Sequence, residues 1–240
     1  MVFEAQQFAS SLAFNQIQEP KVFVDPDYKW ITIGKETMHL DKLRSGVQEL
    51  LSVLESRYLK LTRGNKVLSR MPDQVQDDLT DTCRGYSFLS EEPFYGKRHS
   101  LFLFLVEEYN LAMVDNQGRI SWNIPEIKDL LRTSLLVWEP LYHLLYLTTH
   151  ISCHGTQFVN HQISNADRHR NLFMQGSEMF ILTGYSKRTS VTDRDSCTPG
   201  FLPTQVTQWM LEMLGGGLRT AESLLAGIVY GEESEHLYKT

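Results

Sequence analysis

The stretch that decides the fold is Pro125–Leu147, which has the sequence PEIKDLLRTSLLVWEPLYHLLYL. A proline suits the first turn of a helix, and the apolar residues that follow recur mostly at intervals of three and four. Because they cover more than one face, the pattern predicts a central, buried helix from Pro125 to about Ile151. Pro140 lies inside it, where a proline favours a kink. We therefore expect a mainly helical fold around this segment.

Four further stretches carry a helical pattern. Each one ends at a glycine, asparagine or proline, as helix ends often do. The expected helices are Met38–Leu61, Lys97–Val114 with an exit turn at Asn116–Gly118, a helix opened by Pro203 that stops at Gly215–Gly217, and Arg219–Tyr230.

Two pairs of short β-branched and aromatic runs predict hairpins. The first is Lys21–Val24 with Trp30–Ile33, and the second is Leu172–Met174 with Met179–Thr183, joined by Gln175–Ser177. The apolar run Gly85–Leu89 lies in a long connection and is expected to insert Tyr86 and Phe88 into the core. The fold class expected is mainly α with a small β-hairpin (α+β). Three regions are expected: 1–37 as an extension, 38–151 as a helical region, and 152–240 as hairpin plus helices.

Composition excludes several classes of protein. The chain of 240 residues is 42% hydrophobic, which is enough for a core and excludes wholesale disorder. Its net charge of −6 argues against a surface that is cationic throughout. The 3 cysteines include no C-x-x-C pair and no secretory signal is visible, so we expect reduced thiols in an intracellular, nuclear protein without a membrane span.

Motifs for metal or catalytic chemistry are weak. His150 and His154 are spaced as two helical zinc ligands would be, with Cys153 between them. However, H-E-x-x-H, G-x-S-x-G and the Walker loop do not occur. We expect no cofactor and no metal, and the zinc site stays open as the alternative.

Basic residues flank the second predicted hairpin. The segment 161–219 is the only part of the chain with a slight net positive charge. A hairpin projects alternate side chains to one face, which allows basic residues to reach phosphates. The predicted contacts to double-stranded DNA are Arg168, Arg170, Lys187 and Arg188, and the alternative is an ordinary solvated hairpin.

A series of short motifs carries a family resemblance over roughly residues 45–230. The motifs are Gly85–Leu89, Trp122-Asn123, His154–Gln157, Asn165, Arg170–Phe173, Thr183–Lys187 and Phe201–Pro203. In this order they resemble the region upstream of the RecQ-like helicase domain in large fungal proteins of telomere-linked and mobile-element type. That region is similar to the catalytic domain of tyrosine recombinases, the group that includes the fungal Crypton elements.

The resemblance implies a chemistry that can be compared with this sequence. Tyrosine recombinases cleave DNA with a tyrosine and stabilise the transition state with two arginines, a lysine on a hairpin and a histidine. His154 stands where the first arginine is expected, and it lacks the permanently charged fork of arginine. Lys187 matches the hairpin lysine. The second arginine, its histidine and the nucleophile are expected beyond the end of this chain, and Tyr238 is not nominated.

These observations lead to a preferred function and two alternatives. The preferred expectation is a non-catalytic DNA-binding module of an incomplete, recombinase-like mobile-element protein, working with a helicase or recombinase partner. The alternative is a helical protein-interaction or structural module without nucleic-acid binding, which the net negative charge and the apolar helices favour. An active recombinase or nuclease is disfavoured by His154 and by the missing arginine and histidine.

Overall fold

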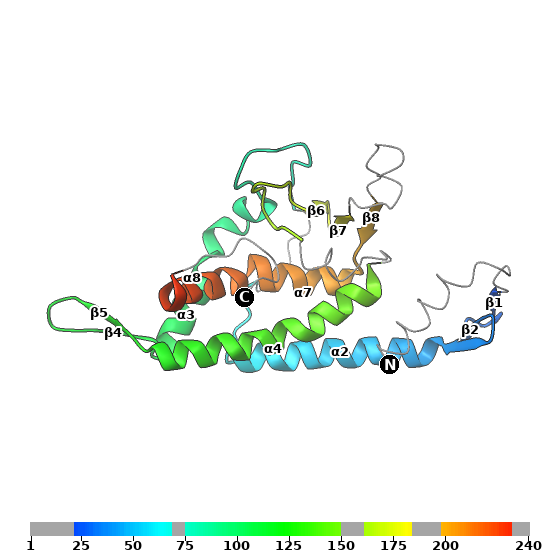
Figure 1. Ribbon diagram of the computed structural model, residues 1–240, viewed down its shortest axis with the longest axis horizontal. Coiled ribbons are helices and arrows are strands. Elements are labelled where there is room, and N and C mark those ends of the chain that lie inside the picture. The colour runs from blue at the N-terminus through cyan, green and yellow to red at the C-terminus, as the bar shows by residue number, and fades with distance from the viewer. Residues whose placement is uncertain (1–21, 69–74, 150–160, 184–197, 232–240) are drawn as a thin grey trace. The chain divides into compact units, whose positions relative to one another are not determined.

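The computed structural model describes residues 22–68, 75–149, 161–183 and 198–231 (Figure 1). In these residues the protein combines helices with small antiparallel sheets, as expected for an α+β chain. Internal contacts divide the chain into two compact units, Met1–Val53 and Leu54–Thr240. The boundary lies inside helix α2 (Leu40–Leu61), and each unit is described by itself.

The described part of the first unit is a three-stranded sheet followed by the start of α2. Its strands are antiparallel in the order β1-β2-β3, namely β1 (Val22–Val24), β2 (Trp30–Ile33) and β3 (Glu36–His39). The predicted hairpin of β1 and β2 is confirmed. The third strand was not predicted; Gly34, with φ of 62°, and Lys35 turn the chain so that Ile33 pairs with Glu36. Because β3 takes residues 36–39, α2 begins at Leu40 and not at Met38.

The second unit is built on packed helices. Helix α4 (Ile124–Thr148) packs against α7 (Thr204–Gly215) and α8 (Leu218–Tyr230), and α3 (Ser100–Glu108) also packs against α8. Helix α4 begins at Asn123, whose side chain accepts from the Glu126 N–H, and it continues through the buried Pro140. The expected central helix and the two C-terminal helices are confirmed. No helix in the described ranges is long and apolar enough to cross a bilayer.

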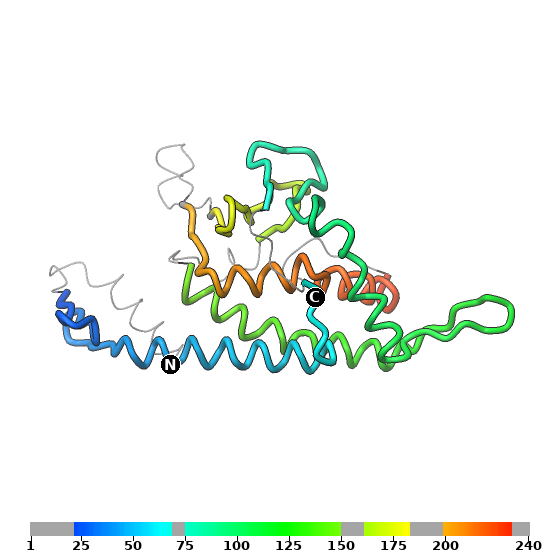
Figure 2. Tube along the Cα trace, turned by 180° about the vertical axis from the view of Figure 1, so that it is seen from behind, coloured from blue at the N-terminus to red at the C-terminus, as the bar shows by residue number. Residues whose placement is uncertain are grey.

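A second three-stranded sheet covers α7. Its order is β6-β7-β8, with β6 (Leu172–Gln175), β7 (Glu178–Thr183) and β8 (Thr198–Phe201). Figures 1 and 2 show this sheet on one side of α7 and α4 on the other. The predicted β6–β7 hairpin is confirmed, and β8 extends it. Phe180 of β7 contacts both Phe173 and Phe201, with ring centroids 5.4 and 5.3 Å away.

One predicted helix is wrong in its second half. Helix α3 ends at Glu108, and Asn110 follows with φ of 49°, a left-handed conformation that a helix cannot continue through. The residues expected to complete the helix instead form a hairpin, β4 (Ala112–Val114) and β5 (Ile120–Trp122). The expected exit turn 116–118 is therefore the hairpin loop.

The triple glycine brings α7 and α8 close to a preceding loop. Gly217 has φ of 92°, which lets the chain reverse direction between the two helices. A Cβ atom on Gly215 would lie 2.3 Å from Cδ1 of Phe94. Phe94 is itself buried and meets Phe88 edge to face at 6.2 Å. The predicted burial of Phe88 is confirmed, whereas Tyr86 is half-buried.

Gly215→Ala should therefore destabilise the second unit. The added methyl group would have to displace the fully buried ring of Phe94, and overpacking of this kind costs about 1–3 kcal/mol. Gly96→Ala is the matched control, because its Cβ would meet nothing within 4 Å and its φ is not positive. Urea unfolding should show a lower midpoint for Gly215→Ala and a change within about 1 kcal/mol for Gly96→Ala. Equal stability of the two variants would contradict the packing described.

Candidate functional site

The predicted phosphate contacts have different fates in the structure. Arg168 is exposed on the loop before β6, and Arg170, two residues later, is buried. Lys187, Arg188 and the degenerate position His154 lie outside the described residues. The two described arginines therefore do not form one basic surface.

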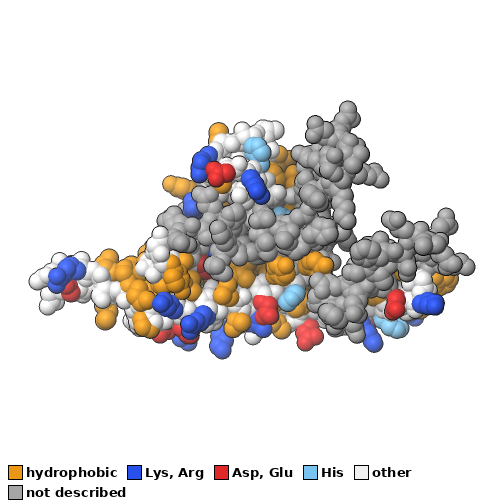
Figure 3. Space-filling model, in the orientation of Figure 1, with side chains coloured by type: hydrophobic (Ala, Val, Ile, Leu, Met, Phe, Trp, Pro, Cys, Tyr) orange, Lys and Arg blue, Asp and Glu red, His pale blue; other side chains and the backbone are white. Residues whose placement is uncertain are grey.

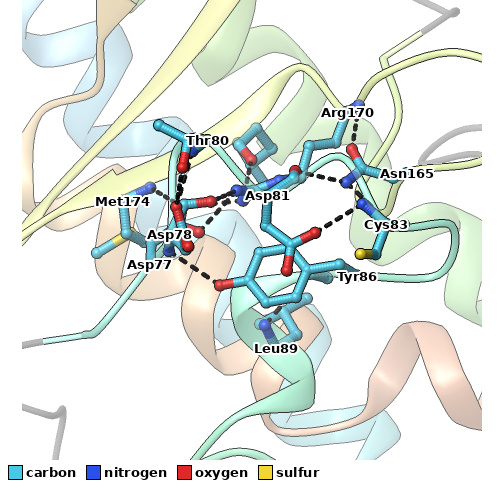
Figure 4. A network of polar contacts seen from close by, with 12 residues as sticks. Asp77, Asp78, Thr80, Asp81, Cys83, Tyr86, Leu89, Asn165, Arg170 and Met174 are labelled. Atoms are coloured by element: carbon cyan, nitrogen blue, oxygen red, sulfur yellow. Dashed lines mark hydrogen bonds and ion pairs between the residues drawn. The ribbon is translucent and has the colours of Figure 1, made fainter.

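Arg170 binds an acidic loop that is distant in sequence (Figure 4). Its two terminal nitrogens contact the two carboxylate oxygens of Asp77 at 2.9 and 2.8 Å. Nη2 also donates to the carbonyl of Asp78 at 2.7 Å. The second carboxylate oxygen of Asp77 accepts from the backbone N–H of Met174 on β6 at 2.9 Å. This bidentate pair fastens the loop to the sheet.

Aromatic rings and an asparagine complete the surroundings of Arg170. The guanidinium carbon lies 4.5 Å from the ring centroid of Phe173 and 5.0 Å from that of Tyr86. The side chain of Asn165 accepts from the Arg170 backbone N–H and donates to the carbonyls of Asp81 and Cys83. The Asn165 backbone exchanges hydrogen bonds with Gly85 and Tyr86. The loops around residues 81–86 and 161–170 are thus tied together on both sides of Arg170.

The burial of this pair decides its role. The Arg170 and Asp77 side chains are 1% and 0% exposed. A guanidinium enclosed by a carboxylate, a carbonyl and two rings has no open side for a phosphate. Arg170 therefore holds the loop in place, and the expectation that it contacts DNA phosphates does not fit its position.

Two other buried carboxylates have structural partners. Glu212 of α7 accepts from the Tyr58 hydroxyl at 2.7 Å and from the backbone N–H groups of Val67 and Leu68. Burial and the neighbouring Glu212 raise the pKa of Tyr58 well above its usual value. Glu222 of α8 accepts from the Trp138 indole N–H at 2.7 Å, and burial raises its pKa while Arg219 opposes the rise. These groups join helices in the core.

The described residues contain little that suggests catalysis or metal binding. No group of three or more His, Cys, Asp or Glu stands together among them. Cys83 is exposed, but the hydrogen bond and the charge of Asp81 raise the pKa of its thiol, which disfavours the reactive thiolate. His150, Cys153 and His154, the alternative zinc ligands, lie outside the described residues.

The exposed positive charge near the site is modest. Arg84 is 74% exposed and forms an ion pair with Asp167 at 3.3 Å, next to the exposed Arg168. The Gly85–Asn165 hydrogen bond of 2.6 Å holds the two loops that carry these arginines together. On the face shown in Figure 3, basic and acidic side chains are interspersed and do not gather into one basic patch.

The most exposed apolar surface of the second unit is on the β4–β5 hairpin. Val114 and Ile120 are paired across the two strands and are 68% and 59% exposed. Because strand side chains alternate, they share one face with Ala112 and Trp122. The loop is closed by Asp115, whose side chain accepts from the backbone of Gln117 and Arg119. The hairpin is thus a defined element with an unpaired apolar face.

Comparisons of the chain with protein-family models, curated proteins and solved structures found no match. The site must therefore be judged on its own geometry. Sequence reasoning missed the hairpin and the partner of Arg170. The hairpin had a usable signal, since Gly118 separates two short runs that contain Val114 and Ile120.

Replacing Arg170 should be far more costly than replacing an exposed arginine. Arg170→Met leaves the buried Asp77 carboxylate without its counter-charge, and breaking such a pair costs about 3–5 kcal/mol. Arg84→Met removes an exposed pair and should cost at most about 1 kcal/mol. Equilibrium unfolding in urea measures both values. Similar midpoints for the two variants would show that the Arg170–Asp77 pair does not hold the fold.

Proposed function

We propose that this chain is a non-catalytic protein-interaction module that binds a partner protein through the β4–β5 hairpin. The observation that carries the proposal is the solvent-exposed apolar pair of Val114 and Ile120 on a two-stranded sheet. Contiguous apolar side chains left in water at a protruding element are typical of binding surfaces. The buried charges of the described core have internal partners, which supports a scaffold role for the rest of the unit.

The backbone of the hairpin supports the same proposal. Asp115 donates its N–H to the carbonyl of Arg119, and Asn123 donates to that of Leu111. Hydrogen-bonded positions alternate along an antiparallel pair, so the backbone groups of Ala112, Val114, Ile120 and Trp122 point away from the partner strand. Both edges of this two-stranded sheet are therefore open within the described part of the chain. A partner strand would gain hydrogen bonds and apolar contact together.

A photo-crosslinking residue placed at Val114 tests the proposal. In an extract of the native cells it should give a protein adduct, because this side chain faces the partner. The second change Ile120→Lys should lower the adduct yield about tenfold, since it places a charge in the apolar contact. Mass spectrometry identifies the adduct.

The matched control is the same crosslinker at Tyr95, which is 66% exposed but lies in the short helix η2 (Tyr95–Lys97). It should give no specific adduct. Equal adducts at both positions, or an adduct at Val114 that Ile120→Lys does not reduce, would reject the hairpin as the binding surface.

DNA binding is the second candidate, and the paired loops carrying Arg84 and Arg168 favour it. These loops bring two exposed arginines to the same side of the Gly85–Asn165 contact. Phosphate contacts of this kind are independent of base sequence and weaken with salt. If Lys187 and Arg188 also take part, as the family resemblance implies, these arginines would be one part of a larger contact.

Fluorescence anisotropy with a short labelled duplex tests this candidate. If the arginines bind phosphates, replacing Arg84 and Arg168 together by alanine should weaken binding and lower the slope of log K against log salt by about 0.9 for each arginine. Arg44→Ala is the control, since Arg44 is exposed and lies in the first unit. An unchanged slope in the double variant, or no binding at low salt, would reject these phosphate contacts.

A further inference from the structure

The edge of the first unit's sheet leads to an inference that is independent of the proposed function. Strand β1 is the outer strand on one side of the sheet in the described residues. Its three residues are all apolar, with Val22 57% and Val24 43% exposed. An exposed apolar edge strand is prone to pair with another strand. The other edge, β3, carries the exposed Glu36 and His39 and is much more polar.

The hydrogen bonds of the sheet show which backbone groups of β1 are directed outward. Asp25 donates its N–H to the carbonyl of Trp30, and the ladder continues with Phe23 opposite Thr32. Since hydrogen-bonded pairs alternate in an antiparallel ladder, Phe23 faces β2, and the N–H and C=O groups of Val22 and Val24 face away from it. The open edge therefore offers two donors and two acceptors.

We propose that two copies of this chain associate through their β1 strands, antiparallel and centred on Phe23. In this register Val22 of each copy pairs with Val24 of the other, and all four outward groups of each strand find partners. The two three-stranded sheets become one six-stranded sheet with twofold symmetry, which closes at the dimer.

Charge complementarity supports a second copy as the occupant. Lys21 and Asp25 flank β1 at equal distances from Phe23 in the sequence. Antiparallel pairing centred on Phe23 places Lys21 of each copy opposite Asp25 of the other. The segment from Lys21 to Asp25 is thus self-complementary in charge, whereas a parallel pairing would oppose like charges.

Both faces of the joined sheet are also compatible with this register. Phe23 stacks on Trp30 with ring centroids 5.2 Å apart. The central pair of the two Phe23 residues would extend this stack into a row of four aromatic rings across the joined sheet. On the opposite face Val22 and Val24 lie beside Ile33 and Ile31, so the apolar surface becomes continuous.

Sedimentation equilibrium of the full chain tests the proposal by charge exchange. The wild-type chain should form dimers, and Lys21→Asp alone or Asp25→Lys alone should raise the dissociation constant about tenfold or more, because each opposes like charges at two places. An equimolar mixture of the two single variants should restore the dimer, because their charges complement each other at both positions. The doubly exchanged chain should also dimerise.

Val22→Pro supplies a test that does not depend on charge. It removes the outward N–H at the first residue of β1 and leaves the β1–β2 hydrogen bonds intact, so the variant should be folded and monomeric. A wild-type chain that is monomeric at its highest soluble concentration would overturn the proposal. A dimer that survives both Lys21→Asp and Val22→Pro, or a mixture that fails to restore association, would overturn it equally.

Discussion

The buried ion pair between Arg170 and Asp77 is the contact on which the arrangement of the second unit depends. It joins the sheet to a loop 93 residues earlier in the chain, and it places Tyr86 over the guanidinium. From there the packing continues through Phe88 and Phe94 to Gly215 at the end of α7. A charge pair and a series of ring contacts therefore connect the sheet, the loop and the helices. The described buried charges hold the fold, and recognition is left to exposed loops and strand edges.

Much of the fold could be predicted because local patterns decide it. Helix α4 has dense apolar periodicity and a proline in its first turn, and α7 and α8 are separated by three glycines. The predictions failed where the local pattern was ambiguous. Leu111–Val114 is apolar like the helix before it, and only the left-handed Asn110 turns the chain into β4. Strand β8 contains Pro199 and Gly200, which seldom suggest a strand, and it forms because β7 offers a partner.

The functional residues were harder to predict for a different physical reason. Arg168 and Arg170 are two residues apart and equally basic in the sequence, yet one is exposed and the other buried. The difference comes from Asp77, whose position opposite Arg170 no local pattern reveals. The exposed faces of the hairpins are likewise a property of tertiary structure, because a β-branched residue favours a strand whether or not another element covers it.

Residue-resolved amide hydrogen exchange on the wild-type chain and on Arg170→Met tests most directly whether the buried pair organises this unit. The Met174 amide donates to Asp77 and the Asp78 amide to the Tyr86 hydroxyl, so both report on the clamped loop. The account predicts that these two amides lose protection in the folded variant while amides in the middle of α4 keep theirs. Unchanged protection at Met174 and Asp78 would contradict it, because the loop would then be held without Arg170.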